Sequence, residues 1–432
     1  MKKMYYFSVV LLLILSINTN LKAQTPLCTK IAGTWAPENT YPNLPVATFY
    51  NAAAWLNNIL YVQAPTSIGA GATTIYKYTY GGIWTIGTHC ITPVAGASMT
   101  ACNGKLYLIG GGATYNTAST TVQEFDPIAN TWATKAPLPI ALSGHGSVCW
   151  GDSVIFVIGG PWSGSASNLN VYYYRPATDT WSTISNSLPA GQGRRGFALG
   201  ITNENKIVMS CGYNTTYLNS TYIGTIGADA SQITWVAAAN APEALSRCGG
   251  AGYDNTFFLV GGSTSIARND TVFLFDVTNN VWNNKIINNP HPVENIYNAI
   301  TVMCVEDTVR VFQPGGLNGS SSSISSFDIT GRGDLIVGIT PKTSTNANIL
   351  KQNYPNPFYQ NTTINYQLTS KSEVVLKVFN NMGNEIYTLV NTIQTPGKYE
   401  VTFDATKLSP GIYIYNLTTN NISQTKRMML LR

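Results

Sequence analysis

The chain has 432 residues, of which 10% are charged and 11% aromatic, and its formal net charge at pH 7 is +5. We expect three lysines, Lys2, Lys3 and Lys22, to be removed with a leader segment. This leaves 22 of the 25 basic residues against 20 acidic ones and excludes an electrostatic basis for binding nucleic acid.

Residues 1–23 have the pattern of a secretory signal peptide. Two early lysines supply the positive charge, residues 9–15 form an apolar run, and Leu21-Lys22-Ala23 provides a cleavage site before Gln24. The apolar run is too short to span a bilayer of about 30 Å. We therefore expect the chain to pass through the periplasm, to lose this segment, and to keep no transmembrane segment.

Residues 24–338 contain a repeat of about fifty residues. Its first anchor is an apolar strand that ends in Gly-Gly, clearest at residues 106–111, 154–160 and 257–262. Its second anchor is a tryptophan that follows an aromatic strand and a turn. The tryptophans are Trp84, Trp132, Trp181, Trp235 and Trp282. Four short strands per repeat with such anchors predict a β-propeller blade, in which each tryptophan packs against a neighbouring sheet.

This pattern resembles the kelch repeat, which has a strand ending in Gly-Gly, a Tyr-Asp-like strand end and a tryptophan on the outer strand. Phe125-Asp126, Phe275-Asp276 and Phe327-Asp328 match the second element. The resemblance covers residues 25 to about 335 and implies an all-β fold. Six strand anchors predict a six-bladed propeller.

The sixth repeat has no tryptophan after Phe327-Asp328. The missing feature occurs near the other end, where Gly33-Thr34-Trp35 is followed by prolines up to Pro45. We expect this N-terminal strand, around Trp35, to complete the last blade and close the ring.

The mature chain contains seven cysteines, so at least one cannot pair internally. They are Cys28, Cys90, Cys102, Cys149, Cys211, Cys248 and Cys304. No two have the spacing of a zinc or redox motif. Three of them precede strands in apolar or small surroundings, where a thiol behaves as a small hydrophobe. We therefore expect buried free thiols.

Residues 339–350 are a short polar linker, and residues 351–432 form a second unit with five alternating strands that predict a β-sandwich. This unit closely resembles the type A C-terminal sorting domain of the type IX (Por) secretion system, which Bacteroidetes use to move proteins across the outer membrane. The matching stretches are YPNPF at 354–358, VFNNMG at 378–383, GKYEVTFDA at 397–405, LSPGIYIY at 408–415 and the ending Lys426-Arg427-Met428. The resemblance implies an immunoglobulin-like fold, the type IX machinery as partner, and a secreted or outer-surface location.

No group of residues in the sequence specifies a reaction. The chain has three histidines, His89, His145 and His291, whereas a copper or zinc centre usually draws on several. Hydrolase signatures, phosphate loops and calcium loops are absent. We therefore expect no cofactor and no metal, and favour a binding protein over an enzyme.

Loops that join one blade's outer strand to the next blade's inner strand emerge on one face, beside the loops after Gly-Gly. We refer to it as the loop face. Positions just past the proline landmarks are Tyr50, Ser98, His145, Arg194, Arg195, Arg247 and Tyr297, with Glu243 nearby. Aromatic residues after Gly-Gly are Tyr115, Trp162, Tyr213 and Tyr217. Our candidate ligand-binding set is His145, Arg194, Arg195, Arg247, Tyr297, Trp162 and Tyr213.

Three functions are compatible with these features. The first is a secreted module that binds a glycan or a protein through the loop face. The second is an enzyme resembling the kelch-type sialic acid mutarotases, in which Arg194, Arg195, Glu243 and Arg247 would hold an acidic sugar. The third is a structural or adhesive surface protein in which the propeller acts as a spacer.

Overall fold

The computed structural model describes most of the chain after the expected signal peptide, residues 1–23, which lies outside the described residues. The described residues are 28, 30–65, 70–114, 116–160, 168–185, 187–203, 205–287, 289, 300–317, 323–330, 334–335, 349–368, 371–380, 385–419 and 422–431. Their regular elements are all strands, and no helix among them is long and apolar enough to cross a membrane. They fall into two compact units, one within Leu27–Ile339 and one within Thr340–Arg432.

Three four-stranded antiparallel sheets in the first unit each correspond to one repeat. The first contains β9 (His145–Trp150), β10 (Val154–Gly159), β11 (Val171–Arg175) and β12 (Thr180–Ile184). The second contains β13 (Ala198–Ile201), β14 (Lys206–Ser210), β15 (Thr221–Ile226) and β16 (Ile233–Ala238). The third contains β17 (Gly249–Tyr253), β18 (Thr256–Val260), β19 (Val272–Asp276) and β20 (Val281–Ile286).

A seven-stranded sheet holds two further repeats, because one long strand serves both. Its strands are β2 (Ala52–Leu56), β3 (Ile59–Gln63), β4 (Ala72–Tyr78), β5 (Thr85–Cys102), β6 (Lys105–Gly112), β7 (Val122–Asp126) and β8 (Thr131–Thr134). The first part of β5 pairs with β4 and its last part pairs with β6.

The last sheet of this unit combines strands from both ends of the sequence: β1 (Lys30–Ala32), β21 (Thr301–Val305), β22 (Thr308–Leu317), β23 (Ser323–Ile329) and β24 (Asp334–Leu335). We interpret the sheets of the first unit as six blades, with β5 shared between the first two.

Tight turns join the inner strand of a blade to its second strand. Asn57-Asn58 and Asn103-Gly104 have positive φ at both residues, as a type I′ turn requires. Asparagine and glycine tolerate this left-handed backbone, and the turn matches the natural twist of the strands. These dipeptides therefore direct the chain back along the same blade.

The tryptophans of the repeat connect neighbouring blades. Each indole N–H donates a hydrogen bond to the outer part of the preceding blade, at 2.8–3.2 Å, in the pairs Trp132 with Thr88, Trp181 with Ala136, Trp235 with Ser187, and Trp282 with Ala239. The rings also pack on an aromatic residue of their own blade, as Trp132 does on Phe125, with centroids 5.2 Å apart. The anchors are therefore structural.

The first blade uses the N-terminal segment in place of a preceding blade. The Trp84 indole N–H donates to the carbonyl oxygen of Pro42 at 2.9 Å. Residues 35–44 lie along β23, because the Leu44 amide donates to Ser325 at 2.8 Å and Trp35 forms a bridge with Thr330. Instead of a regular outer strand, this segment makes isolated contacts.

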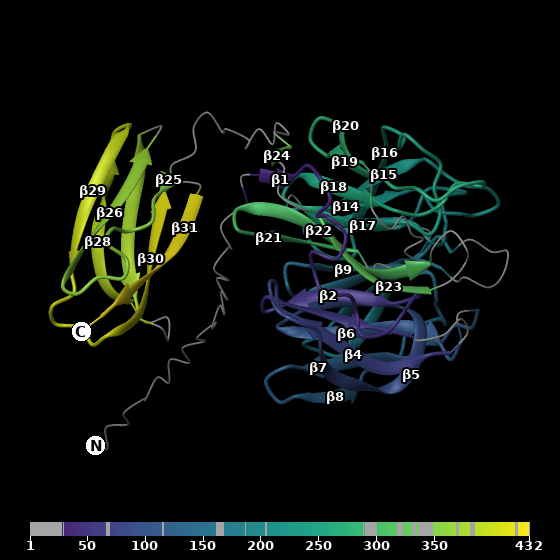
Figure 1. The fold of residues 1–432 in the computed structure, drawn as a ribbon. Coiled ribbons are helices and arrows are strands. Elements are labelled where there is room, and N and C mark those ends of the chain that lie inside the picture. Colours follow the sequence, from purple (N-terminus) through teal and green to yellow (C-terminus); the bar gives the residue numbers. More distant parts are fainter. Residues whose placement is uncertain are drawn as a thin grey trace, which may run out of the picture. The chain divides into compact units, whose positions relative to one another are not determined.

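Strand β1 adds a second connection between the two ends of the propeller sequence. It pairs in parallel with β22 and antiparallel with β24, and Figure 1 shows it in purple beside these green strands. Cys28, just before β1, forms a disulfide with Cys304 of β21.

The expectation of free thiols is wrong for four cysteines. Besides the disulfide at the N-terminus, Cys102 at the end of β5 forms a disulfide with Cys149 of β9. Their Cα atoms are 5.7 Å apart because adjacent inner strands place equivalent positions side by side. Cys90, Cys211 and Cys248 are free and buried.

A polar network joins the second and third blades at the end opposite the loop face. Lys105 forms an ion pair with Glu124 at 2.9 Å, and the Tyr107 hydroxyl donates to the same carboxylate at 2.6 Å. One blade further, the Tyr174 hydroxyl donates to Asp179 at 2.5 Å, and Lys135 of the second blade forms an ion pair with Asp179 at 3.5 Å.

We expect the stability of the propeller to depend on pH through Asp179. Burial acts to raise its pKa, but hydrogen bonds from Tyr174 and the Ala136 amide, with the charge of Lys135, lower it overall. A carboxylate with a lowered folded-state pKa stabilises the protein above its unfolded pKa, near about 3.9, and this contribution is lost as pH falls through the folded value. We expect the melting temperature to fall below about pH 4 and Asp179→Asn to flatten that decline. If the melting temperatures of both proteins fell in parallel between pH 7 and pH 3, this role of Asp179 would be contradicted.

The C-terminal unit contains two antiparallel sheets around a common core. One sheet has β25 (Ile349–Leu350), β26 (Asn361–Leu368) and β29 (Gly397–Asp404); the other has β27 (Ser372–Phe379), β28 (Glu385–Gln394), β30 (Gly411–Thr419) and β31 (Ile422–Leu430). The Phe358 amide donates to the Met429 carbonyl at 2.9 Å, and the Phe358 carbonyl accepts from Leu431 at 2.7 Å. Two of the stretches that carry the sorting-domain resemblance therefore meet at β31.

Candidate functional site

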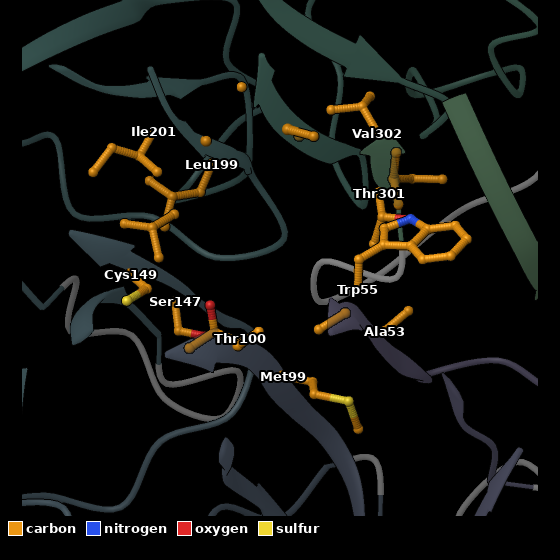
Figure 2. Close-up of a pocket in the computed structure, with 18 residues that line it drawn as sticks. Ala53, Trp55, Met99, Thr100, Ser147, Cys149, Leu199, Ile201, Thr301 and Val302 are labelled. Carbon is orange, nitrogen blue, oxygen red and sulfur yellow. The ribbon is translucent and has the colours of Figure 1, made fainter. Parts of the chain in front are cut away.

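The inner strands line an open cavity of about 270 Å³. It is lined by residues 53–55, 99–101, 147–149, 199–201, 250–252 and 300–302. Figure 2 shows these side chains, including Met99, Leu199 and Val302, around the open centre. Most of the lining is small or apolar, and its one thiol-bearing residue, Cys149, is in a disulfide. The cavity offers no group for acid–base chemistry, so the loop face is the better candidate site.

Arg194 is a structural residue and leaves our ligand-binding set. Its side chain is 2% exposed, and its five N–H donors all have protein acceptors: two on Gln192, two on Ser220 and the Cys211 carbonyl oxygen. Burial lowers its pKa to about 10. No donor of this guanidinium remains for a ligand.

His145 is also buried, at 2% exposure. Its Nε2 atom lies 3.0 Å from the Ser98 hydroxyl, and Gly110 packs against the ring. Burial lowers its pKa to about 4, so the imidazole is neutral at physiological pH. The expectation that His145 binds a ligand is wrong, because the ring fills the junction between the second and third blades.

Two of the predicted ligand-binding residues, Arg195 and Tyr213, lie together on the loop face. Their backbones exchange hydrogen bonds of 3.0 and 2.9 Å, and the Arg195 guanidinium carbon lies 5.2 Å from the centre of the Tyr213 ring. Tyr217 packs edge-on against Tyr213, with centroids 5.5 Å apart. All three residues are half-buried, so they present cationic and aromatic surface together.

Arg247 lies in the next inter-blade junction. Its backbone N–H donates to the Gly196 carbonyl oxygen at 2.6 Å, which places it beside the residue that follows Arg195. Arg247 is half-buried, whereas Glu243 is exposed. Two arginines from adjacent junctions thus share one part of the loop face.

Two of the remaining candidates, Tyr50 and Ser98, do not join this group, because they are buried, at 6% and 0% exposure. Tyr115, Trp162 and Tyr297 lie outside the described residues.

Sequence reasoning missed one loop of the site, between β18 and β19. Ser246 and Ser263 exchange backbone hydrogen bonds of 2.9 Å, as Arg195 and Tyr213 do one blade earlier. The following turn exposes 93% of Ile266 and is closed by a bridge between Ser263 and Arg268. Its position directly after Gly261-Gly262 was the available signal.

Among the described residues, one group of potential metal ligands lies within mutual reach, Cys102, Cys149 and Asp152. Both sulfur atoms belong to the disulfide, so they do not act as thiolate ligands. His89 lies in the outer part of β5 and His145 in the inner strand β9. The described imidazoles therefore do not gather into a copper-binding set.

Comparison with known families identifies both parts of the chain. Residues 352–431 match the secretion system C-terminal sorting domain, and residues 93–139 match the kelch motif. The chain combines kelch repeats with a type IX sorting domain. Both resemblances and the all-β propeller are thereby confirmed, and export to the outside of the cell follows from the sorting domain. The six-blade count and the immunoglobulin-like character of the C-terminal unit stay predictions.

Relatives of this kelch protein are distant. Kelch-like protein 35 of Mus musculus is 28% identical over 253 residues, which cover 56% of this chain and 39% of that protein. Galactose oxidase of Gibberella zeae is 28% identical over 85 residues, covering 20% of this chain and 12% of the oxidase. The chain thus spans well under half the length of these relatives.

Two solved structures share the fold. The structure of YjhT has a TM-score of 0.52 and 14% identity, covering 66% of this chain and 95% of that one. A fungal alcohol oxidase of the AA5 family, in complex with copper, has a TM-score of 0.50 and 14% identity, covering 93% of this chain and all of that one. At such identities the likeness concerns the fold alone.

Proposed function

We propose that the exported propeller is a binding module that recognises an acidic glycan on its loop face. One observation carries this proposal: the Arg195 guanidinium lies over the Tyr213 ring, with Tyr217 against that ring and Arg247 in the adjacent junction. The sorting domain supports a location where extracellular glycans are accessible.

The chemistry of these groups favours a carboxylated sugar. A guanidinium pairs with a carboxylate through two parallel hydrogen bonds, and this planar geometry gives orientation as well as attraction. Aromatic faces accommodate the apolar C–H side of a sugar ring, while tyrosine hydroxyls remain available to donate and accept. A cation held on a tyrosine ring also keeps a defined direction.

Arg195→Ala should weaken binding to acidic glycans at least about tenfold, because a charge-assisted pair contributes roughly 1.5–3 kcal/mol. Mature protein, residues 24–432, would be screened on a glycan array and a protein array, and the best acidic glycan titrated by calorimetry. Arg175→Ala is the matched control, since Arg175 lies at the same 5.2 Å from Tyr173 but at the opposite end of its blade. Equal affinity of the two variants would contradict the proposed site.

The array outcomes separate the other functions. Binding confined to protein targets would replace the glycan with a protein ligand. No binding above background on either array would count against a recognition role and favour a structural or adhesive spacer.

The sugar isomerase is a second candidate, supported by the proximity of Arg195 and Arg247. Arg194 cannot hold the sugar in this reaction, because its donors are all used inside the protein. Glu243 stays a candidate residue for it. The rate of sialic acid anomer interconversion, measured by NMR with and without protein, tests it. Equal rates would remove this candidate.

A further inference from the structure

In five blades, within the part of the chain that the structure describes, one residue adopts a left-handed backbone where the chain enters an inner strand. Strand register defines the equivalent positions. In each of these blades, the residue just before Gly-Gly, or before the dipeptide that takes its place, pairs with a residue of the inner strand, and the left-handed residue lies two positions before that partner. They are Tyr50 (φ 57°), Gly96 (69°), Gly144 (69°), Gly196 (56°) and Arg247 (56°). We refer to these five residues as the axial ring.

The axial ring lies at the loop-face end of the strands that line the central cavity. Backbone hydrogen bonds link three neighbouring pairs of its members: Gly96 donates to Tyr50 at 3.1 Å, Gly196 to Gly144 at 3.2 Å, and Arg247 to Gly196 at 2.6 Å. These bonds join backbone atoms alone, so they do not depend on the side chain at either position.

Glycine is the residue expected at such positions, because a Cβ makes the left-handed backbone unfavourable. Tyr50 has a packing reason to be an exception: it is 6% exposed and its ring lies 4.1 Å from that of Phe49. Arg247 is half-buried and has a left-handed backbone although it is not a glycine. Such backbone outliers are typical of functional positions.

We propose that Arg247 determines the charge specificity of the loop-face site. Its guanidinium, carried by the junction whose backbone N–H donates to Gly196, the residue after Arg195, binds the carboxylate of the glycan. The unfavourable backbone is kept because a glycine there would leave the described axial ring with no exposed cation. This inference rests on the proposed function and adds the residue that selects acidic from neutral ligands.

A pair of variants separates binding from strain. Arg247→Ala removes the guanidinium and keeps the strained Cβ, whereas Arg247→Gly removes both. Calorimetry with 3′-sialyllactose, and with lactose as the neutral probe, should show at least about a tenfold loss of 3′-sialyllactose affinity in both variants. Arg247→Gly should melt about 1–3 °C above Arg247→Ala.

Gly144→Ala is the reverse control. It adds a Cβ at φ 69° in a junction without candidate ligand groups, so it should lower the melting temperature and leave affinity unchanged. Unchanged affinity in Arg247→Gly, together with loss in Arg195→Ala, would overturn this inference alone. If the unaltered protein bound another acidic glycan on the array but not 3′-sialyllactose, the inference that Arg247 binds the carboxylate of 3′-sialyllactose would also be wrong. No binding of any acidic glycan would overturn both proposals.

Discussion

Replacing Cys28 and Cys304 together with serine is expected to lower the free energy of unfolding by about 3–5 kcal/mol, because a disulfide restricts the unfolded chain more when it closes a longer loop. These cysteines are 276 positions apart, whereas Cys102 and Cys149 are 47 apart. The second pair replaced by serine is the matched control and should cost less. Urea unfolding of the oxidised proteins measures both.

The first disulfide has a second role, since Cys28 directly precedes β1, which pairs with β22 of the last sheet. Cys28, Ile31 and Trp35 pack in one core with Ile300 and Val309. Deleting residues 24–45 should therefore expose the edge of β23 and lose a buried tryptophan, at a further cost of about 3–5 kcal/mol. A deletion variant that melted like the intact propeller, or equal losses from both cysteine pairs, would contradict ring closure by the N-terminus.

Removing residues 349–432 is expected to abolish passage across the outer membrane and leave the propeller in the periplasm. The sorting domain that these residues match acts in export, and residues from Leu350 to Leu430 form a core cluster of their own. The truncated propeller should thus remain folded. Cell fractionation of a type IX secreting host, followed by melting of the retained protein, measures both expectations.

Phe358→Ala offers a point-substitution version of that experiment. Phe358 is fully buried and joins the start of the C-terminal unit to β31, so its truncation should cost about 3–5 kcal/mol and impair sorting. Appearance of the truncated chain in the medium would contradict the assignment of export to this unit.

The repeat anchors predicted the fold because they are local. Trp132 and its partner Phe125 lie seven positions apart in sequence and meet through one turn, so pattern alone reveals their strands. The disulfides could not be predicted in the same way. Cys28 and Cys304 come together only when the ring closes, a geometry that no local pattern encodes.

The location of the candidate site could be predicted from the sequence, but the side chains that it exposes could not. Arg194 and Arg195 are adjacent and chemically identical, yet one side chain lies inward against Ser220 and the other lies over Tyr213. His145 lay at a loop-face position in sequence but begins the buried strand β9. The left-handed backbone of Arg247 has no sequence signature, because its equivalents are recognised only from strand register.

A crystal structure of the mature protein with 3′-sialyllactose tests the proposed recognition of acidic glycans most directly. We predict that the sugar ring lies against Tyr213 and Tyr217, with its carboxylate within hydrogen-bonding distance of Arg195 and Arg247. Sugar bound elsewhere on the propeller, or bound at this place with its carboxylate turned to solvent, would contradict the proposed site.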